Sequence, residues 1–270
     1  MKIGSKEFDL ENKIYIMGIL NVTPDSFSDG GQWNHMDRAL KHVEDMVNEG
    51  ASIIDIGGES TKPGYTRISD DEEVERVVPF IESINSRIDV PISIDTYKAA
   101  VAKEAVKAGA HMINDIWGFK SDKNMAKVAA EFDIPCCIMH NRDREKEPYT
   151  NLILDVISDL KESIDIGMSA GVSRDKLIID PGIGFGKSLE ENLKVMKNIG
   201  ELKSLGCPVL LGTSRKSMIG LTLDLPVDER VEGTLATSIY GALNGCSIVR
   251  VHDVKENYRA IKMMEAILKA

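Results

Sequence analysis

The feature that most constrains the fold is a short apolar segment, rich in β-branched residues, that recurs eight times along the chain. Near-continuous hydrophobic strands of this kind are typical of parallel sheets, which are buried on both faces. The segments cover residues 14–21, 53–60, 91–96, 112–118, 135–140, 177–184, 208–216 and 248–253. The segments are evenly spaced, and no linker between two domains interrupts them. This favours a single domain.

The stretches between these segments have the spacing of amphipathic helices. Apolar stripes include Ala39, Val43 and Met46 before the second segment, and Val74, Val77 and Ile81 before the third. Eight strands alternating with eight helices predict either a closed (β/α)8 TIM barrel or a doubly wound open sheet, and the even spacing favours the barrel. We therefore expect a single α/β domain over residues 1–270, with residues 1–13 forming a short hairpin across the bottom of the barrel.

Charge and composition exclude several classes of partner. The formal net charge is −10, which argues against nucleic acid and against an anionic membrane surface, since either would need a basic face. The first ten residues lack the apolar run of a signal peptide, and no stretch has the length of a transmembrane helix. None of the four cysteines forms a CxxC pair, and the adjacent Cys136 and Cys137 should point to opposite faces of a strand. We expect a reduced, cytoplasmic protein.

Polar residues stand at the end of nearly every predicted strand. In a (β/α)8 barrel these ends meet at one rim, where catalytic residues lie. The set comprises Asn21, Glu59, Asp95, Asn114 with Asp115, His140, Asp180, Lys216, and Arg250 with His252. Asp95, Asn114 and Asp180 suit the donor edge of a planar heterocycle, whereas Asn21, Lys216, Arg250 and His252 suit an anion. Asp115, like Asp122 further on, is more simply explained as a helix cap.

Two other patterns predict neither a nucleotide phosphate loop nor a zinc site. The segment DPGIGFGKS (180–188) looks like a phosphate loop, but Walker spacing would put its first glycine where Pro181 stands. The five histidines form neither an HxH nor an HExxH pair, which argues against zinc. The glycines of 180–188 are better explained by a close approach of the backbone to a flat ligand.

Seven short motifs, in this order along essentially the whole chain, resemble the dihydropteroate synthase family of bacterial folate biosynthesis. They are GILNVTPDSFSDGG (18–31), GGESTKPG (57–64), SIDT (93–96), IND (113–115), DPGIGFGK (180–187), GTSRKS (212–217) and RVHD (250–253). The resemblance implies a (β/α)8 barrel. It also implies a transferase that condenses 7,8-dihydropterin-6-ylmethyl diphosphate with p-aminobenzoate, giving 7,8-dihydropteroate and diphosphate with the help of Mg2+.

The resemblance also implies roles for individual residues. The catalytic residues would be Asp95, Lys216, Arg250 and His252. The pterin pocket would comprise Asp95, Asn114, Met139, Asp180, Lys216 and Arg250. The diphosphate would contact Asn21, Thr61, Arg250 and His252, with Asn21 also near the metal ion. The p-aminobenzoate site would comprise Phe27, Thr61, Pro63, Phe185, Lys216 and Ser217.

Further implications are a homodimer formed through outer helices and inhibition by sulfonamides. One residue departs from the family pattern, because Lys62 stands where arginine is usual, and lysine lacks the bidentate fork. Two alternatives stay open: a pterin-binding barrel like the methyltetrahydrofolate:corrinoid methyltransferases, and a catalytically silent barrel that binds a folate precursor. The first would not need the NVTPDSF loop or the basic strand ends, and the second would be expected to lose them.

Overall fold

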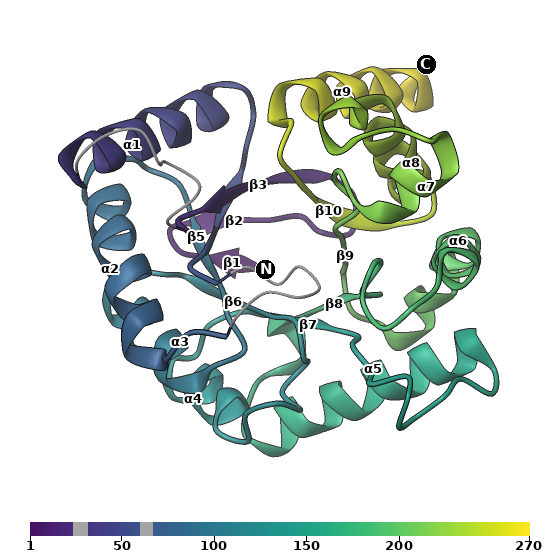
Figure 1. Cartoon of the computed structure of the whole chain (residues 1–270), viewed down its shortest axis with the longest axis horizontal. Helices are drawn as coiled ribbons and strands as arrows, with labels where there is room; N and C mark the ends of the chain where they lie inside the picture. The colour runs from purple at the N-terminus through teal and green to yellow at the C-terminus, as the bar shows by residue number, and fades with distance from the viewer. Residues whose placement is uncertain (24–31, 60–66) are drawn as a thin grey trace.

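Eight parallel strands close into a barrel, as the spacing of the apolar segments predicts. The computed structural model describes residues 1–23, 32–59 and 67–270. Hydrogen bonds link the barrel strands in the order β10-β3-β4-β5-β6-β7-β8-β9 (Figure 1). Their bounds are β3 (Tyr15–Asn21), β4 (Ile53–Gly57), β5 (Ile92–Asp95), β6 (Met112–Asp115), β7 (Cys136–Met139), β8 (Leu177–Asp180), β9 (Val209–Leu211) and β10 (Cys246–Val251).

Helices surround the barrel and cover its outer face (Figure 1). In chain order they are α1 (Gln32–Asn48), α2 (Asp70–Arg87), α3 (Ala99–Lys107), α4 (Met125–Phe132), α5 (Leu152–Ser169), α6 (Leu189–Lys197), α7 (Ser217–Leu223), α8 (Val231–Leu243) and α9 (Val254–Lys269). The described residues thus include one helix more than the eight expected, because both α7 and α8 follow β9. None of the described helices is long and apolar enough to span a membrane.

The predicted hairpin is present and closes the bottom of the barrel. Strands β1 (Lys2–Ile3) and β2 (Lys6–Glu7) pair antiparallel. Ile3 and Phe8 pack in one cluster with side chains from seven barrel strands, namely Met17, Ile53, Met112, Cys137, Ile178, Leu210 and Ile248. In Figure 1 the N-terminus accordingly lies at the centre of the ring of helices. This apolar layer closes the N-terminal end of the lumen, so a ligand site must lie at the other end.

Alternation along the strands separates the lumen from the outer core. Cys136 packs in the outer core beneath the helices, whereas Cys137 belongs to the cluster inside the barrel. The prediction that these two thiols point to opposite faces is therefore confirmed. Because side chains on a strand alternate, residues two positions beyond the apolar layer point into the lumen again, one step nearer the C-terminal rim.

Candidate active site

A polar layer lies directly above the apolar layer of the lumen. It is formed by residues two positions after members of the apolar layer, on five different strands: Asp55, Asn114, Met139, Asp180 and Arg250. Asp95, at the end of β5, joins them through its contact with Arg250. Every residue predicted for the pterin pocket from a strand is thus brought to one place. Only Asp55 is an addition to the predicted set.

Arg250 holds two of the carboxylates together. Its Nε donates to Asp55 Oδ2 and its Nη2 donates to Asp95 Oδ2, both at 2.6 Å. Asn114 Nδ2 donates to the same oxygen of Asp55 at 3.0 Å, which leaves the amide oxygen of Asn114 to face another donor. Burial lowers the pKa of Arg250, but Asp55 and Asp95 outweigh it and raise the pKa above its ordinary value. The guanidinium is therefore charged throughout the working range of pH.

Two carboxylate oxygens in this layer lack a protein partner. Oδ1 of Asp55 and Oδ1 of Asp95 are buried, and neither accepts a hydrogen bond from any described residue. Burial raises the pKa of Asp95 to about 7, and the nearby Asp55 adds to the effect, while Arg250 opposes it. Buried hydrogen-bond acceptors are nearly always paired, so these two unpaired oxygens need an explanation. A ligand that presents N–H groups to the lumen supplies one.

Asp180 and Lys216 form the opposite side of the layer. Asp180 Oδ1 accepts from the backbone N–H of Gly182 at 2.7 Å. Its other oxygen and Lys216 Nζ border the same space, since a Cβ atom built on Gly212 would be 3.8 Å from Asp180 Oδ2 and 3.9 Å from Lys216 Nζ. Burial raises the pKa of Asp180, against the effect of Lys216, and burial lowers the pKa of Lys216 to about 8. Gly212 leaves the space between these groups open.

An apolar platform lines the rim beside the carboxylates. Met139 packs with Tyr97 and Ile116, and the partly buried Trp117 and Phe185 pack against them. The ring of Phe185 also lies under the ammonium of Lys216, whose Nζ is 4.7 Å from the ring centroid. Flat apolar walls next to convergent polar groups are the usual arrangement of a site for a small heterocycle.

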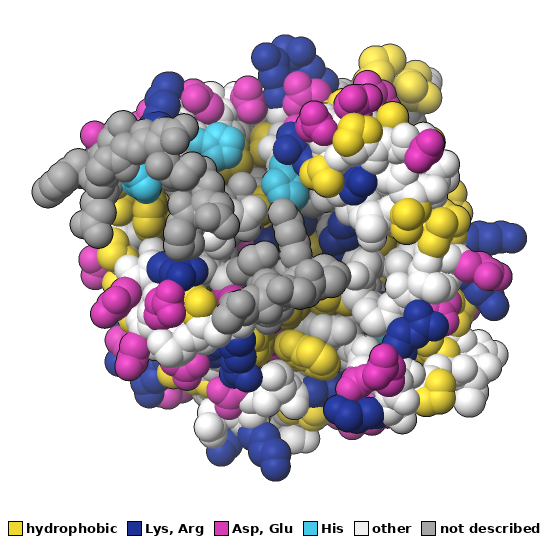
Figure 2. All heavy atoms as spheres, in the orientation of Figure 1, with side chains coloured by type: hydrophobic (Ala, Val, Ile, Leu, Met, Phe, Trp, Pro, Cys, Tyr) yellow, Lys and Arg dark blue, Asp and Glu magenta, His cyan; other side chains and the backbone are white. Residues whose placement is uncertain are grey.

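The residues predicted for an anion lie around the same rim. Figure 2 shows histidine and basic side chains near the middle of this face. His252 is half-buried and is oriented by Ser214, whose Oγ lies 3.0 Å from His252 Nδ1 and accepts from His252 N at 3.1 Å. Asn21 is exposed at the end of β3, with its Oδ1 3.7 Å from the position of a Cβ on Gly57 and thus close to Asp95. Ser217 is exposed as the first residue of α7.

Three of the polar strand ends do not join the site: Glu59 and His140, which had been grouped with it, and Asp115, for which a cap was expected. Glu59 accepts from Tyr97 and Lys98, Asp115 accepts from the backbone of Trp117 and Phe119, and His140 faces Asp159. Asp115 and His140 follow an inward-pointing residue directly, so alternation turns them away from the lumen. Asp115 does cap a turn, as the simpler explanation held. Asp122 caps α3, since its Oδ2 accepts from Ala99 N at 2.9 Å.

Phe27, Thr61, Pro63 and Lys62 lie outside the described residues. The residue of this layer that the sequence analysis did not name is Asp55. It stands inside the apolar segment IIDIGG, where a fully buried carboxylate is rare unless it is paired. An acidic residue in the middle of an apolar segment is the sequence signal that could have identified it.

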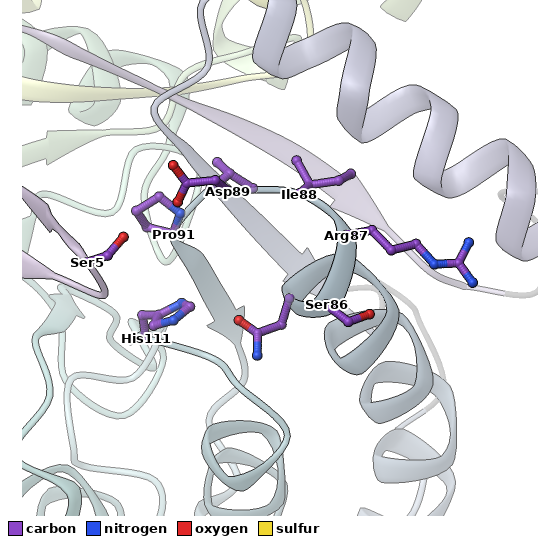
Figure 3. A pocket seen from close by; sticks show the side chains of 9 residues that line it. Ser5, Ser86, Arg87, Ile88, Asp89, Pro91 and His111 are labelled. Atoms are coloured by element: carbon purple, nitrogen blue, oxygen red, sulfur yellow. The ribbon is translucent and has the colours of Figure 1, made fainter.

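A separate cavity of about 440 Å3 lies at the other end of the barrel (Figure 3). Ser5 from the N-terminal hairpin, the segment from Asn85 to Pro91, and His111 line it. His111 Nδ1 accepts from Ile92 N at 3.1 Å, so the imidazole supports the start of β5. Barrel enzymes carry out their chemistry at the C-terminal ends of the strands, and this cavity is at the N-terminal ends.

Comparisons with known proteins agree with the geometry. Residues 17–252 match the family described as pterin binding enzyme. The chain is 60% identical to a dihydropteroate synthase of Clostridium beijerinckii, with full coverage of both chains. A dihydropteroate synthase crystal structure from Clostridium difficile, determined in the presence of pteroic acid, is 51% identical, with 98% of this chain and 100% of that chain covered and a TM-score of 0.94.

Two further solved structures hold other ligands. A dihydropteroate synthase of Xanthomonas albilineans with 4-aminobenzoic acid is 38% identical over 96% of this chain and 94% of that chain, with a TM-score of 0.91. A dihydropteroate synthase of Yersinia pestis in a sulfonamide drug complex is 42% identical over 100% of this chain and 99% of that chain, with a TM-score of 0.92.

Proposed function

Because the chain belongs to the dihydropteroate synthase family of pterin-binding enzymes, we propose that its strand-end site condenses 7,8-dihydropterin-6-ylmethyl diphosphate with p-aminobenzoate. The products are 7,8-dihydropteroate and diphosphate. The observation that carries the assignment is a pair of buried oxygens, Oδ1 of Asp55 and Oδ1 of Asp95, which no described donor reaches and which lie in one layer with Asp180. A pterin ring presents several N–H groups in one plane and pairs with such acceptors.

The pterin half of the site recognises the ring by its edge and by its face. Asp180 and Asp95 accept from ring and amino N–H groups, and Asn114 pairs with a donor through its amide oxygen. Met139 and its apolar neighbours contact one face of the ring. Arg250 binds Asp55 and Asp95, and this contact orients both carboxylates for the substrate. A preorganised site loses less conformational freedom on binding.

Substitution takes place at the methylene carbon attached to the ring. The ring nitrogens donate electron density to that carbon while the C–O bond to diphosphate breaks, which favours a dissociative, cation-like transition state. The carboxylates of Asp95 and Asp180 stabilise the positive charge that develops on the pterin. The amine of p-aminobenzoate then forms the new C–N bond and loses a proton. The protein supplies no nucleophile in this scheme.

The departing diphosphate needs positive charge and hydrogen-bond donors. Arg250 and His252 lie at the rim where this group would project, and Lys216 stands between the two halves. Ser214 accepts from the backbone of His252 and therefore has its hydroxyl hydrogen available for His252 Nδ1. The hydrogen of a neutral imidazole then sits on Nε2, where it can donate to an anion.

Mg2+ fits the donors present at this rim. Among the described residues no three acidic, histidine or cysteine side chains form a metal cluster, but Mg2+ commonly binds one or two protein oxygens together with phosphate and water. Asn21 presents an exposed amide oxygen near Asp95 and would hold the ion beside the diphosphate. A bound Mg2+ would neutralise charge on the leaving group. Asn21→Ala should raise the Mg2+ concentration needed for half-maximal rate, and an unchanged titration would argue against this role.

The p-aminobenzoate half-site would lie between Lys216, Phe185 and Ser217, with Phe27, Thr61 and Pro63 completing it. Lys216 Nζ donates to Ile183 O and lies over Phe185, so it can reach a carboxylate or a ring edge at this place. A sulfonamide carries the same aniline and should compete for the same position. Sensitivity to sulfonamides is therefore part of the proposal.

A homodimer is the proposed assembly. Nine of the twelve large apolar side chains that are exposed in the described part of the chain lie between residues 217 and 269. They cover α7, α8 and α9, which pack against one another in sequence, and Figure 2 shows hydrophobic side chains on that side of the molecule. Exposed apolar surface of this kind marks protein interfaces. The four buried free thiols support a cytoplasmic location, where thiols stay reduced.

One experiment separates the proposal from a corrinoid methyltransferase. Purified protein is incubated with the dihydropterin diphosphate, p-aminobenzoate and Mg2+, and 7,8-dihydropteroate is measured by mass spectrometry. The proposal predicts product without any cobalamin. Methyl transfer from methyltetrahydrofolate that depends on a corrinoid, with no dihydropteroate formed, would support the alternative.

A further inference from the structure

The lysine of the phosphate-loop-like segment 180–188 does not face the site. Lys187 Nζ instead points back under the loop and donates to Gly182 O at 2.9 Å and to Phe185 O at 3.0 Å. His140 Nδ1 lies 2.9 Å from the same nitrogen. An ammonium has three N–H donors and no acceptor, so these three partners use all of them. Lys187 forms no ion pair with an acidic side chain of the described residues, which is unusual for a largely buried cation.

The histidine partner is itself held in one form. His140 Nε2 lies 3.0 Å from Asp159 Oδ2, and Arg142 binds both oxygens of Asp159 at 2.9 Å. Burial raises the pKa of Asp159, but its bonds to His140 and Arg142 outweigh this and hold the pKa well below the usual range. Burial lowers the pKa of His140 to about 4, with the charge of Lys187 adding to the effect. A neutral imidazole that donates from Nε2 presents an acceptor at Nδ1.

The loop that Lys187 binds forms one wall of the pterin pocket. Between its two carbonyl contacts lies Ile183, whose carbonyl accepts from Lys216 Nζ. At one end, Gly182 N donates to Asp180 Oδ1. At the other, the ring of Phe185 lies under the Lys216 ammonium. The loop thus contacts both residues of this side of the site, and Lys187 fixes it at each end.

The backbone path of this loop depends on close contact with the segment after β7. Gly182 has a φ of +66°, and a Cβ atom there would lie 1.9 Å from His140 O. The loop can therefore not carry a side chain at this point without moving away from His140. Lys187 joins the same two segments through its side chain, so both features hold the loop in one position.

We propose that Lys187 is a positioning residue for the reaction: through Gly182 and Phe185 it sets the loop that places Asp180 and Lys216 against the pterin. This inference rests on the proposed function. The positive charge of Lys187 also lies near Asp180 and helps to keep that carboxyl group ionised. The charged groups around Lys187 are Asp180, Lys216, Glu191 and Asp159. Burial lowers the pKa of Lys187 to about 7, and loss of the proton would remove one of the three donors.

The variant Lys187→Met tests the role because methionine keeps most of the length of the side chain and removes its donors. The binding of 6-hydroxymethyl-7,8-dihydropterin is measured by calorimetry, and kcat and KM are measured for both substrates. Loss of a group that orients a metal ligand typically changes affinity or activity by roughly 10–100-fold, and we take this as the scale for Lys187. We expect the pterin affinity of Lys187→Met to fall by about tenfold or more. The circular dichroism spectrum of the variant should equal that of the wild type, because the barrel stays folded. Lys194→Met, at an exposed position of α6, makes the same charge change and should leave both measurements unchanged.

A double variant distinguishes positioning from a loss of stability. If Lys187 acts through Lys216 and the loop, the loss caused by Lys187→Met should shrink when Lys216→Met is already present, because coupled residues are not additive. Lys187→Arg, which keeps the charge and the donors, should recover part of the affinity. Wild-type pterin affinity in Lys187→Met, or a loss that is fully additive with Lys216→Met, would overturn the proposal. Failure of the wild type to bind the pterin would instead count against the proposed function.

Discussion

Arg250 and Asp95 form an ion pair at 2.6 Å in the lumen of the barrel, although they are 155 residues apart in the chain. The pair joins the last barrel strand to the third, and with them the side of the site proposed for the anion and the side proposed for the pterin. Asp55 shares the same guanidinium, so two carboxylates compete for one cation. This surplus of negative charge at a buried place has consequences that can be measured.

Asp95 should make pterin binding depend on pH. Its pKa is raised from 3.8 to about 7 in the folded chain, so the group favours folding at low pH, and this contribution is lost as the pH rises through about 7. The ionised carboxylate is the form that accepts N–H donors. Pterin affinity, measured by calorimetry, should therefore rise between pH 6 and pH 8. In Asp95→Asn the affinity should be lower and this rise absent; an equal pH dependence in the variant would rule out Asp95 as its source.

Asp180 should be required for pterin recognition in every state of the reaction. Asp180→Asn keeps the shape of the side chain but removes the charge and replaces one acceptor by a donor. Hydrogen bonds to charged groups contribute about 1.5–3 kcal/mol, so pterin affinity should fall by roughly 10–100-fold in calorimetry. Asp175→Asn, at an exposed position, is the matched control. Near-normal affinity in Asp180→Asn would remove the residue from the pocket.

A buried cluster next to the site should matter for stability. Lys98 Nζ lies 2.7 Å from both Glu59 Oε2 and Glu73 Oε2, and all three side chains are at most 4% exposed. Lys98→Met would leave two buried carboxylates without their cation and should lower the free energy of unfolding by about 3–5 kcal/mol in urea denaturation. Lys103→Met breaks an exposed pair with Glu131 and should cost about 1 kcal/mol or less.

The pH dependence of the Lys98 variant provides a second check. Burial raises the pKa of Glu73 above its ordinary value, against the effect of Lys98. Without the lysine, protonation of the glutamates removes the unpaired charge, so the stability difference from the wild type should narrow as the pH is lowered. A difference that is the same at all pH values would mean that lost packing, and not unpaired charge, causes the destabilisation.

The exposed apolar surface of α8 should carry the dimer contact. Leu243 is 54% exposed on α8, and Leu154 is 59% exposed on α5, outside the proposed interface. Leu243→Glu should shift the protein from dimer to monomer in analytical ultracentrifugation, whereas Leu154→Glu should leave it dimeric. A wild type that sediments as a monomer at all concentrations would contradict the proposed assembly.

Much of the fold and the site could be predicted from local pattern. The eight apolar segments predicted the barrel strands, and polar residues at their ends predicted Asp95, Asn114, Asp180 and Arg250 as neighbours. Asp55 was missed because it lies inside a strand and not at its end. The same rule admitted His140 wrongly, because it counted every polar residue near a strand end, whereas His140 directly follows the inward-pointing Met139 and so points away from the lumen.

Contacts between side chains far apart in the chain could not be predicted from the sequence. The bond from Lys187 to His140 spans 47 residues, and the one from Arg250 to Asp55 spans 195. Such pairings depend on strand register and loop path, which spacing along the chain does not determine. The sequence suggested that the glycines of 180–188 let the backbone approach a flat ligand, but the inward direction of Lys187 appears only in the folded chain.

The most direct test of the account is the release of diphosphate from the dihydropterin substrate, followed with and without p-aminobenzoate. The account predicts release that requires p-aminobenzoate and Mg2+ and is blocked competitively by a sulfonamide. Release at the same rate without p-aminobenzoate, or no release under any of these conditions, would contradict the assignment of the strand-end site.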